Sequence, residues 1–245
     1  MTNNNMYFIA NWKMYGNINS VNTIKNVIKI SKSKKYKKSN IIYCPPYTLI
    51  NEFVKKTKNS KIKIGAQNCH TENNYGPHTG EISSKMIKNL GCSYVIIGHS
   101  ENRKNGDNDR IINLKIRSAL KEGLKVIFCI GESLKERKNK QTINVLKRQI
   151  KKGLNKIKNL NKIILAYEPV WSIGTGMVLK NKDLEDQIFK IKKLVPKKVK
   201  ILYGGSVNPK NITNLSTINN ISGFLIGGAS QNSKKFIDII KKTII

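Results

Sequence analysis

The 245-residue sequence has few acidic residues, few arginines, no long apolar run and only four cysteines. The cysteines are widely spaced, at Cys44, Cys69, Cys92 and Cys129. Without a C-x-x-C pair they predict neither a zinc site nor a dense disulfide framework. No apolar run approaches about 18 residues, the length that would cross a membrane, and the first residues lack the pattern of a signal peptide. We therefore expect a globular, cytoplasmic protein with no metal site.

The shortage of acidic residues leaves 46 Lys and Arg against 14 Asp and Glu, a formal net charge of +32. Such a charge raises the alternative of a protein that binds nucleic acid through phosphate contacts. However, only five of the 46 cations are Arg, the residue suited to bidentate base readout. The lysines are scattered in pairs rather than gathered with aromatic residues. This distribution favours a solvated basic surface, with no dedicated nucleic-acid or membrane partner.

Eight short runs are expected to be buried strands because they are almost continuously apolar, as in VIIG, VIFCIG and IILAY. They cover residues 7–11, 41–44, 62–67, 94–97, 126–130, 163–167, 200–203 and 223–226. Eight strand-and-helix units of about 31 residues each (245/8), with no break in composition, predict an α/β protein that is a single (β/α)8 TIM barrel over 1–245. A doubly wound open sheet is the alternative, but G-x-G-x-x-G is absent after the first strand.

Helical spacing of apolar residues predicts helices over 20–32, 109–122 and 139–158. Gly123 follows the second of these as a stop signal. Asn181 is expected to cap a further helix, and Asn208 to cap another whose first residue is Pro209.

Function in such a barrel lies at the carboxyl ends of the strands and in the loops that follow. Those positions hold one Lys, one His and several Glu, together with glycine-bearing loops after the sixth, seventh and eighth strands. Glycine lets the backbone approach a ligand closely, so these loops predict N–H groups around an anion. Lys, His and Glu suffice for proton transfer beside a phosphate-bearing carbonyl compound. No pattern indicates nicotinamide, flavin or metal, so no cofactor is expected.

Eight motifs in order make the sequence resemble the triosephosphate isomerase family along nearly its whole length. They are NWKM (11–14), GAQN (65–68), TGEIS (79–83), GHSE (98–101), CIGE (129–132), YEPVWSIGTG (167–176), YGGSV (203–207) and GFLIGGAS (223–230). One motif alone is weak, but eight in order along the predicted strand ends are specific. The resemblance implies isomerisation of dihydroxyacetone phosphate and D-glyceraldehyde 3-phosphate through an enediol(ate), in glycolysis and gluconeogenesis.

The resemblance also assigns the catalytic groups. Glu168 matches the base that moves the proton, His99 a neutral electrophile at the carbonyl, and Lys13 the cation that stabilises the oxyanion and the phosphate. The family is itself a standard illustration of groups tuned for this chemistry, so the assignment is carried by the resemblance. Asn11 is the fourth catalytic residue that the resemblance implies, and it would orient the substrate and the catalytic groups. Supporting roles in the proton relay are expected for Ser100 and Glu101.

Residues 169–177 match the family's lid over the phosphate, which excludes water on closing. The dianion is expected to meet the backbone N–H groups of Gly174, Ser206, Gly227 and Gly228. Tyr203 and Ser206 would latch the lid, and Glu132, Tyr167 and Trp171 would support its hinge. Thr79 would reach the neighbouring subunit's site, so a homodimer is expected.

Three positions depart from the family pattern. Tyr15 and Asn102 stand where the family has Asn and Arg, near the expected subunit contact. Gln231 replaces the Leu that, with Ile173, would sandwich the base in apolar surroundings, and a polar Gln is expected to leave Glu168 a weaker base. The alternative function is a catalytically impaired basic barrel that acts as a nucleic-acid-associated or scaffold protein; the intact Lys, His and Glu argue against it.

Overall fold

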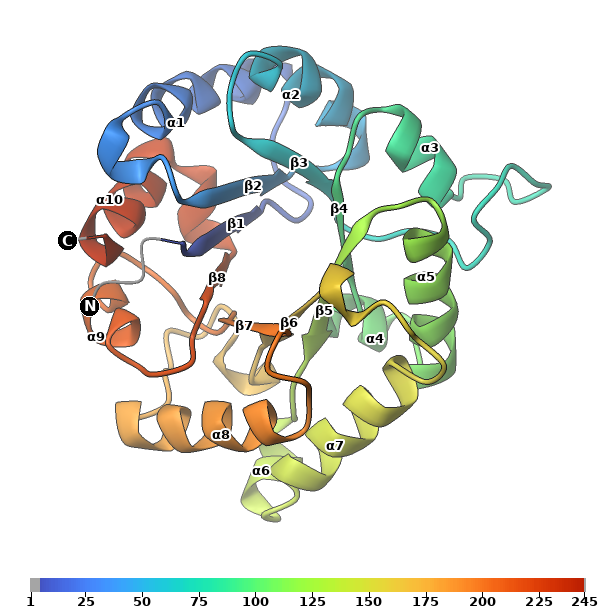
Figure 1. The fold of residues 1–245 in the computed structure, drawn as a ribbon, viewed down its shortest axis with the longest axis vertical. Coiled ribbons are helices and arrows are strands. Elements are labelled where there is room, and N and C mark those ends of the chain that lie inside the picture. The colour runs from blue at the N-terminus through green and yellow to red at the C-terminus, as the bar shows by residue number, and fades with distance from the viewer. Residues whose placement is uncertain (1–4, 245) are drawn as a thin grey trace.

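A computed structural model describes residues 5–244 and shows eight parallel strands closed into a barrel in sequence order (Figure 1). The strands are β1 (Tyr7–Asn11), β2 (Asn40–Cys44), β3 (Lys63–Ala66), β4 (Tyr94–Ile97), β5 (Lys125–Ile130), β6 (Ile163–Tyr167), β7 (Lys200–Tyr203) and β8 (Gly223–Ile226). Each expected strand is present within one residue of its predicted ends. The predicted fold class is confirmed.

Alternating residues of each strand divide the apolar side chains between two cores. One core fills the barrel interior with residues such as Ile9, Ile96 and Ile164. The other lies between the strands and the surrounding helices, and includes Phe8 and Ile97. Because both faces of every strand are buried, the strands are apolar almost throughout, as parallel sheets require.

In several strands, the inward-facing position beyond the last apolar residue holds a polar residue or a glycine. Asn11 follows Ile9, and Glu168 follows Ala166, at the carboxyl ends of β1 and β6. Gly204 and Gly227 occupy the next inward positions after β7 and β8. Because side chains alternate between the two faces of a strand, these four residues lie at the carboxyl mouth of the barrel and face its interior.

Helices surround the barrel (Figure 1). They are α1 (Ile24–Ser31), α2 (Ile50–Thr57), α3 (Ser84–Asn89), α4 (Ser100–Lys104), α5 (Asp109–Lys121), α6 (Leu134–Lys138), α7 (Thr142–Gly153), α8 (Asn181–Lys193), α9 (Ile212–Ser216) and α10 (Ser233–Thr243). Side-chain caps begin several of them: Asn108 accepts from two N–H groups of α5, and Ser133 and Glu136 form a capping box on α6.

The predicted helix over 109–122 agrees with α5, but the two other long predictions are corrected. Residues 20–32 begin as a 3₁₀ helix over Ile18–Thr23, capped by Asn17, and become α-helical only at Ile24. Residues 139–158 hold only α7, because Lys140 and Lys156 adopt left-handed backbone conformations, with φ of 57° and 58°, on either side of it.

Two predicted caps are also corrected. Asn181 is the first residue of α8 rather than its cap, which is Lys180. Asn208 accepts from the N–H groups of Lys210 and Asn211 and so stabilises a turn, while α9 starts only at Ile212. An asparagine that bonds its own downstream backbone favours a turn as readily as a helix start.

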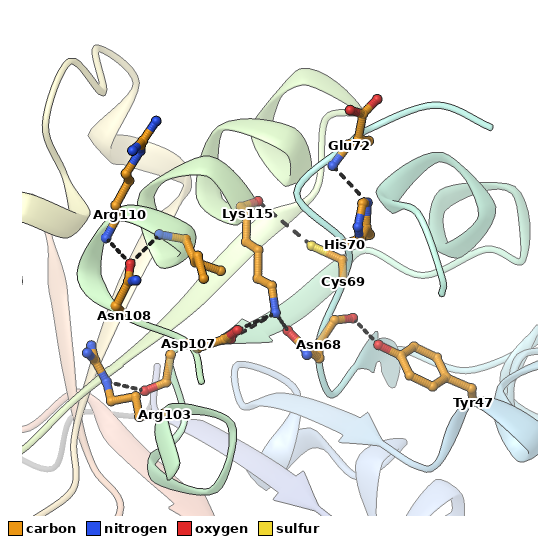
Figure 2. A network of polar contacts seen from close by, with 12 residues as sticks. Tyr47, Asn68, Cys69, His70, Glu72, Arg103, Asp107, Asn108, Arg110 and Lys115 are labelled. Atoms are coloured by element: carbon orange, nitrogen blue, oxygen red, sulfur yellow. Dashed lines mark hydrogen bonds and ion pairs between the residues drawn. The ribbon is translucent and has the colours of Figure 1, made fainter. Parts of the chain in front are cut away.

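The segment between β3 and α3 projects away from the barrel (Figure 1). A buried ion pair fixes its base: Nζ of Lys115 on α5 contacts both carboxylate oxygens of Asp107 at 2.8 Å and Oδ1 of Asn68 at 3.2 Å (Figure 2). Tyr47 donates its hydroxyl proton to the carbonyl of Asn68. The start of the projecting segment is therefore tied to three parts of the barrel.

Within residues 5–244, no helix is long and apolar enough to cross a membrane, and no group of His, Cys, Asp and Glu could hold a metal ion.

Candidate active site

A cavity of about 750 Å³ opens at the carboxyl mouth of the barrel. Its walls come from loops after β1, β4, β6, β7 and β8 and from the start of α10. It gathers all eight residues predicted to be catalytic or to bind the phosphate, namely Asn11, Lys13, His99, Glu168, Gly174, Ser206, Gly227 and Gly228, and also Ile173, which was predicted to pack on the base. These positions are spread over more than 200 residues of sequence and meet only because the barrel closes.

Glu168, the predicted base, is 4% exposed at the floor of the cavity. Burial raises the pKa of its carboxyl, and the nearby imidazole and ammonium groups offset this only in part. Its Oε1 lies 3.6 Å from Nε2 of His99, and its Oε2 has no hydrogen-bond partner among the described residues. One carboxylate oxygen is thus unengaged beside the cavity, as a proton acceptor requires.

His99 caps the short helix α4 and is 3% exposed. The backbone N–H of Glu101 donates to Nδ1 of the ring at 3.2 Å. A ring nitrogen that accepts a hydrogen bond carries no proton, so the neutral ring has its proton on Nε2. Nε2 lies 3.6 Å from Oε1 of Glu168, and His99 is part of the cavity lining.

Lys13 has a left-handed backbone, with φ of 56°, which is rare for a residue with a side chain. Hydrogen bonds on both sides hold it there: its N–H donates to Oδ1 of Asn11 at 3.1 Å, and its carbonyl accepts from Nε2 of Gln67 at 2.8 Å. Its ammonium group contacts Oε1 of Glu101 at 2.7 Å. Burial opposes ionisation of Glu101, but the hydrogen bond from Lys13 leads the effects that lower the pKa of that carboxyl.

The predicted anion-binding groups line the same cavity as the catalytic candidates. Gly174 and Gly228 are exposed to it, and a Cβ atom at Gly228 would meet nothing within 4 Å, so this part of the wall is open backbone. Gly228 is also the first residue of a 3₁₀ helix, where the N–H has no intrahelical partner. The N–H of Ser206 is engaged with Oγ of Ser172 at 3.3 Å.

The lid is held against the loop after β7. Ser206 accepts from the N–H of Gly176 at 3.2 Å and donates to the carbonyl of Ser172 at 2.6 Å. Ser172 in turn donates to the carbonyl of Met177 and lies 3.4 Å from the hydroxyl of Tyr203. Tyr203 and Ser206 are therefore in contact with the lid, where the sequence expected its latch.

The beginning of the lid is held by a carboxylate that is completely buried. Glu132 accepts from the hydroxyl of Tyr167 at 3.2 Å and from the indole N–H of Trp171 at 3.1 Å. Burial raises the pKa of Glu132, in spite of these donors and of Arg137 at 3.6 Å. The three residues expected at the lid's hinge are thus one connected group.

The remaining predicted residues lie outside the cavity lining. Ser100 is buried at the start of α4, and Thr79 is exposed on the projecting segment after β3. Gln231 directs its amide toward the carbonyl of Trp12 at 3.4 Å rather than toward the base. The weakening of Glu168 expected from a polar residue 231 stays a prediction; the carboxyl itself is buried, and burial raises its pKa.

Several residues important to this geometry were assigned no role from sequence. Gly204 is one: a Cβ there would lie 2.7 Å from Cγ and 2.9 Å from Oε1 of Glu168. Ser172 bonds to the carbonyl of Met177 in the lid, and Gln67 bonds to the carbonyl of Lys13. Both residues belong to family motifs, which were the signal in the sequence that could have found them. Lys210 and Lys235 also line the cavity, and no sequence pattern distinguishes them from the other lysines.

Comparison with known proteins agrees with this geometry. The triosephosphate isomerase family profile matches residues 6–243. Triosephosphate isomerase of Dictyoglomus thermophilum is 43% identical, with 95% of this chain and 97% of the relative covered. The enzyme of Thermodesulfovibrio yellowstonii is 42% identical, with 96% and 98% covered.

A solved structure gives the same result. The crystal structure of triosephosphate isomerase from Bartonella henselae superimposes with a TM-score of 0.88, at 34% identity, and the match covers 97% of this chain and 98% of that one. The alternative of an impaired nucleic-acid-associated or scaffold barrel receives no support from these relatives. The chain belongs to the triosephosphate isomerase family.

Proposed function

We propose that this protein interconverts dihydroxyacetone phosphate and D-glyceraldehyde 3-phosphate, without a cofactor, in glycolysis and gluconeogenesis. The observation that carries the proposal is the convergence of Glu168, His99 and Lys13 on one cavity in a member of this family. A carbon acid needs a positioned base and donors placed where the oxyanion forms. The three residues supply a base and two donors.

Glu168 takes a proton from the carbon next to the substrate carbonyl, and the electron pair of that C–H bond forms the double bond of an enediolate. The negative charge develops on the carbonyl oxygen, where Nε2–H of His99 and the ammonium of Lys13 stabilise it. The carbon-bound proton then returns to the neighbouring carbon, and a proton passes from the hydroxyl oxygen to the former carbonyl oxygen, so carbonyl and hydroxyl exchange places. Burial, which raises the pKa of Glu168, makes its carboxylate a stronger base.

The open backbone at Gly174 and Gly228, together with Gly227 beside Lys13, binds the phosphate of the substrate, and Ser206 joins them when its N–H leaves the hydroxyl of Ser172. The contacts between the lid and Ser206 support a lid that closes over it. Closure removes water, which protects the enediolate and strengthens the electrostatic interactions within the cavity.

A coupled assay with D-glyceraldehyde 3-phosphate tests the proposal. The purified protein is expected to turn the substrate over, and Glu168→Gln to lower kcat by about 10³-fold or more, within the range for loss of a general base. Glu52→Gln, on the surface of α2, is the matched control and should keep full activity. Absence of turnover in the unmodified protein, or full turnover in Glu168→Gln, would overturn the proposal.

We propose further that the protein is a homodimer formed through the projecting segment and the loop after β1. Large apolar side chains are exposed on these parts: Met14 is 94%, Tyr15 59%, Ile18 60% and Tyr75 62% exposed. Exposed apolar groups on neighbouring functional loops indicate a covered surface. The Lys115–Asp107 ion pair supports this role, since it holds the base of the segment that carries Thr79.

Sedimentation at two salt concentrations tests the dimer. Two subunits together carry 2 × 32 = +64, so association should tighten as moderate salt screens their repulsion. Tyr75→Lys should weaken it, whereas Phe189→Lys, an exposed aromatic residue on α8, should not. A monomer at every salt concentration, or equal weakening by both variants, would contradict the proposal.

We propose that the chain functions as one barrel domain in the cytoplasm. Its four cysteines are free and buried, which suits a reducing compartment.

A further inference from the structure

Two lysines beyond Lys13 lie on the wall of the cavity: Lys210, in the turn after β7, and Lys235, in the first turn of α10. The same cavity is lined by Ser206, Gly227 and Gly228, the groups proposed to bind the phosphate. The cavity lining therefore holds two cations in addition to Lys13.

Local hydrogen bonds fix the backbone of each lysine. Oδ1 of Asn208 accepts from the N–H of Lys210 at 2.8 Å, and Oδ1 of Asn232 accepts from the N–H of Lys235 at 3.1 Å. The two asparagines thus hold the lysine backbones in place on the rim, although the side chains themselves reach solvent.

The two ammonium groups differ from Lys13 in their partners. Lys13 is paired with Glu101 at 2.7 Å, whereas in the described part of the chain no carboxylate or other group is bonded to Nζ of Lys210 or Lys235. Asp238, the acidic residue of this wall, is neutralised by Lys242 at 3.1 Å. Both charges are therefore available to a ligand.

A phosphate dianion in the cavity would be attracted by both cations without direct contact. Charges separated by less than about 10 Å, the Debye length at 0.1 M salt, still interact appreciably. Since both lysines are exposed on the rim and, in the described part of the chain, neither is bonded to Glu168 or His99, their charge favours binding of substrate and transition state alike. Such uniform binding changes KM and leaves kcat unchanged.

We propose that Lys210 and Lys235 are phosphate-recognition residues of this site, which attract the dianion of the substrate by charge from the cavity rim. This rests on the proposed isomerase function. It assigns two of the 41 lysines a role in substrate binding, while the rest of the lysine excess needs none.

The test compares Lys210→Gln, Lys235→Gln and the double variant with Lys234→Gln, which removes the same charge one residue away from the cavity lining. The readouts are KM, kcat and the inhibition constant of inorganic phosphate, at about 20 mM and about 300 mM salt. At low salt each single variant should raise KM and the inhibition constant about two- to threefold, and the double variant about five- to tenfold, with kcat within about twofold. High salt should abolish most of the difference, and Lys→Arg should restore binding.

Three results would overturn this inference: a double variant no different from Lys234→Gln at low salt, an effect that survives high salt unchanged, or a loss confined to kcat. Any of these leaves the isomerase proposal standing, provided that the unmodified protein turns the substrate over. Failure of that protein to turn it over would instead count against the proposed function, and phosphate binding would then still report on the two lysines.

Discussion

The barrel mouth and the helical shell use charge in different ways. At the mouth, Lys13, Glu101, His99 and Glu168 form a chain of contacts at 2.7, 3.4 and 3.6 Å that leads from solvent to a buried carboxylate. On the shell most lysines are exposed, and those that pair with an acidic residue of their own helix meet it one turn away, as in Lys190–Asp186. The few charges at the mouth converge on one point, whereas the many on the shell do not.

The site therefore depends on charged groups that are buried and lie close together, and not on the number of charges. An exposed pair one helical turn apart contributes only about 0.3–0.5 kcal/mol to stability. A group beside reacting atoms in a cavity that excludes water changes the barrier of the reaction by several kcal/mol. The net charge of +32 therefore describes the shell and says little about the chemistry.

The sharpest test of this comparison removes the same charge from each region. Lys13→Met should lower kcat/KM by about 10³-fold, because it removes a donor from the developing oxyanion. Lys25→Met, on the exposed face of α1, should change it by less than about twofold. Steady-state kinetics on both variants checks this, and comparable losses would show that bulk charge rather than position supports activity.

Adding one methyl group at the mouth should have the next largest effect. In Gly204→Ala the new Cβ would lie 2.7 Å from Cγ of Glu168 and must displace the base. Misplacement of about 1 Å costs up to about 10²-fold in rate, so kcat should fall about 10- to 100-fold. Circular dichroism should show the same fold, and the inhibition constant of phosphate should be nearly unchanged. An unaltered kcat would mean that the position of Glu168 is not critical.

Stability should respond to the buried base in the opposite direction from activity. The pKa of Glu168 is raised by burial above its unfolded value, so the folded chain binds the proton more tightly, and stability falls as pH rises from the unfolded to the folded pKa. Glu168→Gln removes this penalty and should raise the free energy of unfolding by about 1 kcal/mol or more at pH 8, with little gain near pH 4. Urea unfolding at both pH values measures it; a destabilised variant at pH 8 would contradict the burial argument.

Position 231 should have the smallest effect. Because the amide of Gln231 meets the carbonyl of Trp12 and not Glu168, Gln231→Leu should change kcat by less than about twofold. The sequence predicted that the polar Gln231 leaves Glu168 a weaker base, which would make Leu at this position raise turnover. A severalfold gain would restore that earlier view and show that the polar side chain does weaken the base.

Much of the fold was predictable because parallel strands that are buried on both faces appear in the sequence as short, nearly continuous apolar runs. Runs such as VIIG and IILAY gave all eight strands within one residue. Helix boundaries were less predictable. Apolar residues keep helical spacing across residues 139–158, but Lys140 and Lys156 adopt left-handed backbone conformations on either side of α7. A left-handed lysine carries no compositional signal.

Site residues were predictable where the side chain itself can take part in proton transfer or charge stabilisation. They were not predictable where only the position of the residue in the folded chain matters. Glu168, His99 and Lys13 are titratable residues at strand ends within family motifs, and they meet as predicted in one cavity. The closeness of Gly204 to Glu168 depends on the packing of β6 beside β7. Lys210 and Lys235 could not be recognised among 41 lysines until the barrel closed.

The central claim is that Glu168 carries a proton between adjacent carbons of the substrate. Turnover in D₂O tests it most directly, because a carboxylic acid exchanges its proton with solvent before returning it. Mass spectrometry should find deuterium at the carbon next to the carbonyl of the product. Glu168→Gln should form such deuterated product far more slowly. Equal incorporation of deuterium by the variant would contradict the account.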